Sequence, residues 1–241
     1  MIKHIPNFIT CLNLVCGCLG CIAIMHDQPQ YASYLIILAL VFDFFDGFAA
    51  RMLHVASPIG KELDSLADVV SFGLLPGLIM YWLIAKNLSE NMELPNLVIL
   101  ALPFLGFVLT VFSALRLAKF NVDTRQTDSF IGVPTPANAL LIASLVLIDS
   151  EHLFFELTSS LVFLVGTTLI MSWLLVSPLP LIALKFKSYS WDKNKFQYTL
   201  LLLSLLLFAI LKFGAMPIII ILYITISLLS NRDSTKQRVE I

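Results

Sequence analysis

The stretch from Asp43 to Asp68, DFFDGFAARMLHVASPIGKELDSLAD, carries four aspartates where one apolar segment ends and the next begins. Acids near a membrane are costly, and they indicate a functional site by default. Asp43 and Asp46 are three residues apart, and Asp64 and Asp68 are four apart, so each pair shares one face of a predicted helix. Pro58 lies between the pairs and favours a turn between two helices. Two antiparallel helices would therefore direct four carboxylates into one gap.

Four unpaired anions in one gap repel one another, so either some of them bind protons or divalent cations neutralise them. All-oxygen ligands suit Mg²⁺, Mn²⁺ or Ca²⁺ better than zinc. Four acids are enough for two bridged cations, and such pairs recur in phosphoryl chemistry. The alternative is a polar end of a helix hairpin, with acids that are solvated or paired with Arg51 and Lys61. We predict a metal site formed by Asp43, Asp46, Asp64 and Asp68.

Two glycines accompany the acids. Gly47 directly follows the second aspartate, and Gly60 precedes the third by one turn. Glycine inside a helix costs about 1 kcal/mol relative to alanine, and close approach of a ligand is one reason to accept that cost. Ala50 keeps the same face thin, and Arg51 offers a fork of hydrogen-bond donors for phosphate oxygens. The pattern therefore indicates a phosphate-bearing ligand.

Composition indicates an integral membrane protein. Of the 241 residues, 59% are hydrophobic and 13% are charged, whereas a soluble domain is roughly a quarter charged. A spanning helix needs roughly 20 apolar residues. We predict one all-α, polytopic membrane domain over residues 1–241, with no nucleic-acid partner and about eight transmembrane helices, at 9–25, 31–50, 67–85, 96–115, 134–149, 158–177, 198–213 and 214–230.

Charge placement predicts the orientation. With eight spans, Lys86 and Lys212 fall on one side of the membrane, and the other thirteen of the 15 basic residues fall on the opposite side. Because basic residues accumulate in cytoplasmic loops, we expect both termini and the aspartates to face the cytoplasm from the inner membrane. The eight-span count also needs a break between the last two helices, which Lys212, Gly214 and Pro217 favour.

The aspartate stretch fits D-x2-D-G-x2-A-R-x8-G-x3-D-x3-D without gap or substitution, and this pattern resembles the signature of the CDP-alcohol phosphotransferase family. The segment PNFITCLN, residues 6–13, is similar to the start of the family's first helix. The resemblance implies transfer of a phosphate-linked group from a CDP-alcohol to a hydroxyl, with release of CMP and with two divalent cations, Mg²⁺ or Mn²⁺, on the four aspartates. It implies that Asp68 takes the acceptor proton. It also implies a CDP pocket lined by Asn13, Asp46, Gly47, Ala50, Arg51, Gly60 and Asp64.

RLAKFN, residues 116–121, followed by FIGVPTPA, residues 130–137, resembles the phosphatidylserine synthase branch of the family. That branch uses CDP-diacylglycerol as donor and L-serine as acceptor. Arg116 or Lys119 would hold the serine carboxylate, and Asn121 would position the substrate. Alternatively, the two basic residues only anchor a loop at the membrane. A glycerol 3-phosphate or inositol phosphate acceptor stays open, as does a cation- or proton-coupled transporter.

Gly73 and Gly77 form a GxxxG pattern in the third segment. Such a pattern favours close helix packing, either between two copies or within one chain. Pro76 inside the pattern favours packing within the chain. Members of the resembled family tend to dimerise, and we therefore expect a homodimer whose interface is not assigned.

Overall fold

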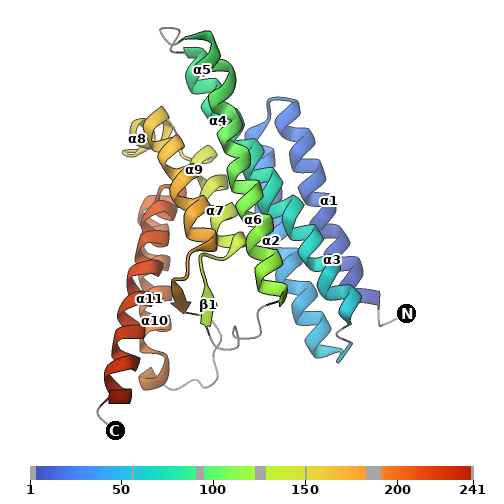
Figure 1. Cartoon of the computed structure of the whole chain (residues 1–241), viewed down its shortest axis with the longest axis vertical. Helices are drawn as coiled ribbons and strands as arrows, with labels where there is room; N and C mark the ends of the chain where they lie inside the picture. Colours follow the sequence, from blue (N-terminus) through green and yellow to red (C-terminus); the bar gives the residue numbers. More distant parts are fainter. Residues whose placement is uncertain are drawn as a thin grey trace.

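The computed structural model describes residues 4–55, 57–90, 95–122, 129–149, 151–182 and 191–239. The basic residues Lys3, Arg125, Lys185 and Lys187 lie outside these ranges. The described chain is a bundle of long helices (Figure 1). Its helices are α1 (Ile5–Met25), α2 (Pro29–Met52), α3 (Pro58–Asp68), α4 (Leu75–Glu90), α5 (Asn96–Ala101), α6 (Gly106–Val122), α7 (Thr135–Val146), α8 (Phe155–Ser159), α9 (Leu161–Val176), α10 (Trp191–Leu211) and α11 (Met216–Val239).

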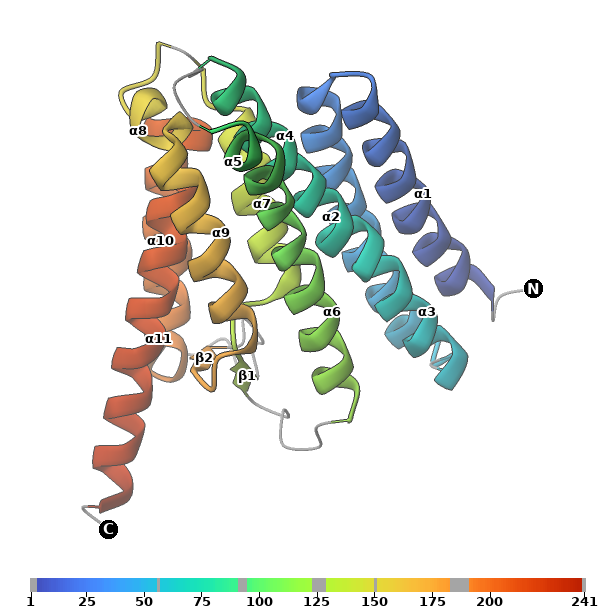
Figure 2. The ribbon, with the colours of Figure 1, turned by 45° about the horizontal axis from the view of Figure 1, so that its top comes forward.

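Five helical stretches in the described ranges are long and apolar enough to cross a membrane: Ile5–Met25, Pro29–Met52, Pro58–Ser89, Asn96–Val122 and Asn194–Ser230. Helices α7 and α9 are apolar but shorter. The all-α membrane class is therefore confirmed, while the number of eight spans stays a prediction. The last stretch contains the predicted break, because the short helix η4 (Lys212–Ala215) joins α10 to α11 and Lys212 has a φ of 48°. Figures 1 and 2 both show α10 and α11 side by side.

The second pair of aspartates lies on one helix, as their spacing predicted. That helix, α3, begins at Pro58, ahead of the predicted transmembrane span at 67–85, and Ser57 caps it: the Ser57 hydroxyl accepts a hydrogen bond from the Gly60 N–H at 3.1 Å. Proline suits the first helical position. Beyond Asp68 the helix widens into a π-helical turn, η2 (Val69–Leu74), before α4. Wide turns of this kind are frequent at functional sites.

The GxxxG pattern packs within the chain. Gly73 and Gly77 face α6, where an added Cβ on Gly77 would lie 3.0 Å from the Gly106 carbonyl oxygen and would collide with the Thr110 side chain. An added Cβ on Gly73 would lie 3.1 Å from Ser113 Cβ. Of the two alternatives for this pattern, the structure therefore has the packing inside one chain.

A short pair of strands, which the sequence did not predict, closes the end of the bundle near the start of α7. Strands β1 (Ser129–Ile131) and β2 (Pro180–Ile182) pair antiparallel. The Ile182 N–H donates to the Ser227 hydroxyl at 3.1 Å, and the Tyr223 hydroxyl donates to the Ile182 carbonyl at 3.0 Å. These two bonds fasten the strand pair to α11.

Candidate active site

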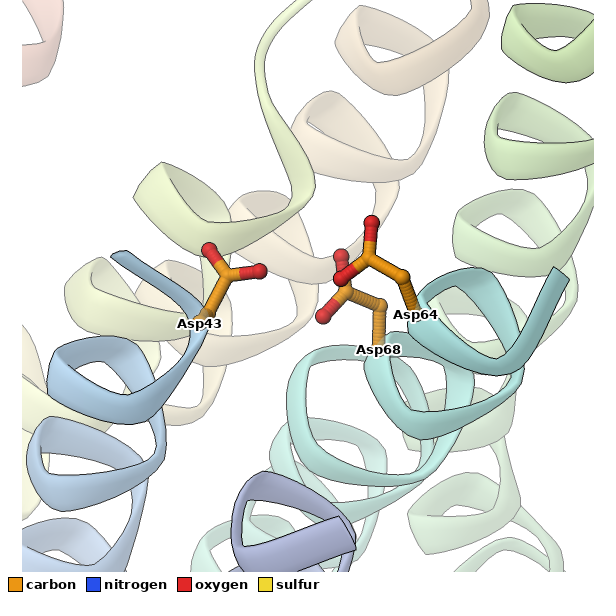
Figure 3. Close-up of side chains that lie close together, drawn as sticks. All are labelled: Asp43, Asp64 and Asp68. Carbon is orange, nitrogen blue, oxygen red and sulfur yellow. The ribbon is translucent and has the colours of Figure 1, made fainter. Parts of the chain in front are cut away.

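Three of the four aspartates meet between α2 and α3. One carboxylate oxygen each of Asp43, Asp64 and Asp68 lies within 4.8 Å of the other two. Figure 3 shows Asp43 directed from α2 toward Asp64 and Asp68 on α3. Asp68 is buried, and the other two side chains are partly buried. The helix spacing thus produces the expected convergence for these three acids.

Asp46 has a different environment. Its side chain is buried, and its Oδ2 accepts a hydrogen bond from the Thr10 hydroxyl of α1 at 2.7 Å. It does not belong to the group of three acids within the described residues. Asp46 therefore lies beside the cluster, between α1 and α2, and lines the neighbouring pocket.

Asn13 connects α1 to the cluster. The amide Nδ2 of this fully buried residue donates to Asp68 Oδ1 at 3.1 Å. The Asn13 carbonyl oxygen accepts from the Ser71 hydroxyl of η2 at 2.9 Å. An added Cβ on Gly17, one turn further along α1, would come within 2.5 Å of Ser71 Oγ. This close contact brings η2 onto α1, while the Asn13 amide is the group that contacts Asp68.

A pocket of about 220 Å³ adjoins the acids. Five of the seven residues predicted to bind CDP line it: Asp46, Gly47, Ala50, Gly60 and Asp64. The pocket lining also includes Pro6, Asn7, Thr10, Val55, Ser57 and Lys61. Asn13 is absent from this lining because its side chain faces Asp68. Most of the residues predicted to bind CDP therefore line a single pocket next to the aspartate cluster.

The two glycines have different roles in the pocket. A Cβ on Gly60 would lie 3.0 Å from Asn7 Oδ1 and 3.1 Å from Ser57 Oγ, so glycine lets α1 and the helix cap come together. At Gly47, apart from the helix's own backbone, the only atoms of the described residues within 4 Å of an added Cβ belong to Arg51, at 3.6 Å or more. The protein itself therefore tolerates a side chain at Gly47, and the space above it is open to a ligand. Arg51 is exposed at the edge of this space.

The three predicted acceptor residues lie at the end of α6 and differ in their surroundings. Lys119 is exposed. The Asn121 amide donates to the Ser65 hydroxyl at 2.9 Å, and its main-chain oxygen accepts from Lys61 Nζ at 3.1 Å. Asn121 thus joins α6 to α3. Arg116, in contrast, is buried, and Asp68 is close enough to interact with it electrostatically.

Arg116, Thr135 and Asn138 form a buried polar cluster in which several hydrogen-bonding atoms are unpaired among the described residues. Arg116 Nη1 donates to the Thr135 hydroxyl of α7 at 2.9 Å, while Arg116 Nε has no hydrogen-bond partner in the part of the chain that is described. Asn138, one turn along α7 from Thr135, is fully buried, and both of its amide atoms lack a partner among the described residues. Buried polar atoms are rarely left unpaired without a reason. The group therefore offers donors and an acceptor to a small ligand.

The acid cluster fits a divalent cation. At separations up to 4.8 Å, each pair of ionised carboxylates repels by about 3 kcal/mol at an effective dielectric constant near 20. Asp64 Oδ1 is buried and accepts no hydrogen bond within the described ranges. Hard cations such as Mg²⁺ and Mn²⁺ prefer such oxygen donors. The donor set and the orphaned oxygen therefore both suit a metal ion.

The fold and the site together define an integral membrane protein with an acidic, metal-type cluster beside a polar pocket. A family model described as CDP-alcohol phosphatidyltransferase matches residues 3–179, and the chain belongs to this family. The predicted family and the predicted enzyme class are confirmed. The family generally uses divalent metals, in agreement with the acidic cluster.

Several curated relatives agree with the predicted branch. A CDP-diacylglycerol–serine O-phosphatidyltransferase of Helicobacter pylori is 35% identical over 202 residues, which cover 83% of this chain and 80% of the relative. The Bacillus subtilis protein of the same name is 34% identical over 138 residues, covering 56% and 70%. An archaetidylserine synthase of Methanothermobacter thermautotrophicus is 30% identical over 173 residues, covering 70% and 67%.

Sequence reasoning assigned no binding or catalytic role to four residues that lie at the site: Thr10, Lys61, Thr135 and Asn138. Thr10 lies in the segment PNFITCLN, and Thr135 and Asn138 lie in and next to FIGVPTPA, so the matched segments already pointed to their neighbourhoods. Their individual contacts depend on how α1 and α7 cross the aspartate helices. No spacing within one helix reveals such a crossing.

Proposed function

We propose that the protein transfers the phosphatidyl group of CDP-diacylglycerol to the hydroxyl of L-serine, producing phosphatidylserine and CMP. The observation that carries this proposal is the juxtaposition of the carboxylate cluster with a pocket of about 220 Å³ on one side and the buried Arg116 on the other. The names of the similar proteins support serine as the acceptor.

We assign Asp43, Asp64 and Asp68 as cation ligands. Asp46, which lines the pocket, would contribute a ligand to the second cation. Two Mg²⁺ or Mn²⁺ ions held there would neutralise the diphosphate and stabilise the departing CMP. Gly47, Ala50 and Gly60 leave room for the nucleotide, and Arg51 reaches phosphate oxygens from the pocket edge. Asn13 contributes indirectly, because it orients Asp68.

The reaction is a single displacement. The acceptor hydroxyl oxygen forms a bond to the phosphorus that bears the diacylglycerol, the bond from that phosphorus to the CMP oxygen breaks, and the hydroxyl proton passes to Asp68. A hydroxyl is a poor nucleophile unless a base removes its proton during attack. Asp68 suits this role because Asn13 engages only its Oδ1, and its burial restricts competing water.

The acceptor site lies between Asp68 and the start of α7. Serine carries a carboxylate and an ammonium group, so it needs both donors and an acceptor. Arg116 Nε and Asn138 Nδ2 supply donors, and Asn138 Oδ1 supplies an acceptor. Compared with the sequence-based prediction, this proposal keeps Arg116, assigns Asn121 to positioning α6 on α3, and leaves the exposed Lys119 at the periphery.

The orientation and the assembly are also proposals. The bias of basic residues supports a cytoplasmic active site and cytoplasmic termini, which suits a donor whose acyl chains stay in the bilayer. We propose that residues 1–241 form one membrane domain and that the protein is a homodimer. Gly73 and Gly77 are not its interface, since both pack on α6.

Purified protein supplied with CDP-diacylglycerol and Mn²⁺ or Mg²⁺ tests the proposal. We expect CMP release and a new phospholipid with L-serine, and neither product after chelation of the metal. Glycerol 3-phosphate and inositol phosphate serve as competing acceptors, with products identified by mass spectrometry. Turnover with a phosphorylated acceptor and none with serine would contradict the assignment.

A further inference from the structure

A second cavity, of about 600 Å³, lies at the end of the bundle far from the aspartates. The start of α2, the ends of α4 and α7, α8 and the start of α9 form its wall, and these helix ends gather at one end of the molecule in Figure 2. Along α2, the distance from Pro29, which lines the cavity, to Asp46 is about 25 Å at 1.5 Å per residue. This approaches the roughly 30 Å thickness of a bilayer core. The cavity therefore opens at the opposite membrane surface from the active site.

The cavity contains two opposite charges. Lys86 lines it, with Nζ 5.0 Å from the centre of the Trp82 ring. Asp149 lines it as well, and within the described residues its carboxylate makes no hydrogen bond or ion pair. Both side chains are exposed and therefore accessible to a ligand. The cavity is therefore lined by one cationic and one anionic side chain.

Hydrogen bonds hold this wall in place. Trp82 Nε1 donates to Asp27 Oδ1 in the connection between α1 and α2. Asn87 Nδ2 donates to the Ser159 carbonyl at 2.9 Å, which ties the end of α4 to α8. A wall that is already ordered loses little conformational freedom when a ligand binds. The cavity is therefore a preformed site.

The surroundings of the cavity suit a lipid. Trp82 and Tyr34 line it, and such aromatic side chains are typical of the membrane interface. Next to the lining residues of α8 and α9, the side chains of Leu157 and Val162 are 59% and 84% exposed. Acyl chains would follow this apolar surface, while the headgroup would occupy the polar cavity.

We propose that this cavity binds the headgroup of a zwitterionic aminophospholipid from the leaflet opposite the active site, with the phosphate at Lys86 and the ammonium group at Asp149. A ligand with both charges satisfies both side chains, whereas a purely anionic headgroup satisfies only Lys86. The proposal is independent of the reaction that the aspartates perform.

Lipid-dependent thermal unfolding of the purified protein in detergent tests it, because a ligand that binds only the folded state raises the Tm with its concentration. The probe is dioleoyl phosphatidylethanolamine. For Lys86→Gln and Asp149→Asn, we expect the apparent Kd to rise at least about fivefold, the factor for loss of one charge contact near 1 kcal/mol. Lys86→Arg should retain binding.

Matched controls come from the neighbouring cavity and the active site. Lys212→Gln and Glu151→Gln change residues that line only the adjacent cavity, and Asp64→Asn changes the active site; all three should keep the wild-type Kd. An unchanged Kd in Lys86→Gln would overturn the proposal.

Equal stabilisation by soluble glycerophosphoethanolamine would also overturn it, because the ligand would then be a free zwitterion. Phosphatidylglycerol should bind more weakly, and Asp149→Asn should not weaken its binding.

Discussion

The side-chain amide of Asn13 donates a hydrogen bond to the carboxylate of Asp68, with 3.1 Å between Nδ2 and Oδ1. The two residues come from α1 and α3, and the bond is buried. It engages Asp68 Oδ1, and Figure 3 shows the Asp68 carboxylate beside that of Asp64. Asn13 is therefore a positioning residue for the base that we assign to Asp68.

Replacing Asn13 with alanine should lower kcat by roughly 100-fold, because a misplaced reacting group costs about that much. The KM values for both substrates should change little. Ser71→Ala is the matched control, since it removes a neighbouring hydrogen bond to the Asn13 main chain and leaves the Asp68 contact in place. Steady-state kinetics on both variants measure the difference. Equal losses of kcat in the two variants would indicate a purely structural role.

The three clustered acids should dominate cation binding. Asp43→Asn, Asp64→Asn and Asp68→Asn should each weaken Mn²⁺ binding by at least about 10-fold, as measured by electron paramagnetic resonance without substrates. Glu62→Gln is the control, because Glu62 is exposed on α3 and lies outside the cluster. Wild-type affinity in all three Asn variants would show that the cluster does not hold the metal. A stoichiometry of one Mn²⁺ in the wild type would contradict the second cation.

The spacing of the aspartates within each helix could be interpreted from the sequence, but their contacts with residues of other helices could not. Intervals of three and four residues favour one helix face for each aspartate pair. This spacing predicted the convergence of Asp43, Asp64 and Asp68, but not the contact of Asp46 with Thr10. Thr10 and Asn13 act across 36 and 55 residues of sequence. Their contacts follow from the packing of α1 on α2 and α3, and a single sequence does not contain that geometry.

The same distinction explains the acceptor residues. Leu109, Ser113 and Arg116 occupy one buried face of α6, at helical intervals of four and three, whereas Lys119 is exposed one turn later. The sequence showed two basic residues near a membrane surface and offered no means to separate them. The packing of α7 separates them, because the inward-facing Arg116 donates to Thr135 of that helix, whereas Lys119 stays exposed.

Thr10→Val should raise the KM for CDP-diacylglycerol by about 10-fold and leave the KM for serine unchanged. Valine keeps the shape of threonine but leaves Asp46 Oδ2 without its donor, and hydrogen bonds to charged groups contribute about 1.5–3 kcal/mol. Thr10→Ser retains the hydroxyl and should behave as wild type. Initial rates at varied donor concentration measure the effect. A change confined to the serine KM would refute the placement of Asp46 in the nucleotide pocket.

Asn138→Ala distinguishes an acceptor site from a structural defect. If the unpaired amide serves only packing, its removal should be neutral or stabilising, because an unsatisfied buried polar group is unfavourable. If it binds serine, the KM for serine should rise about 10-fold while the donor KM stays the same. We expect the second result for Asn138→Ala and for Arg116→Lys. Lys119→Ala should show wild-type kinetics, since its side chain is exposed.

Gly77→Ala should destabilise the bundle without changing its oligomeric state. The new methyl group would meet the Thr110 side chain and the Gly106 carbonyl of α6, and overpacking of this kind costs about 1–3 kcal/mol. The Tm in detergent should therefore fall. Gly166→Ala is the control, because among the described residues no atom outside its own helix backbone lies within 4 Å of its added Cβ, and its Tm should stay the same or rise. A monomer produced by Gly77→Ala at unchanged Tm would instead place the glycine pair at a subunit interface.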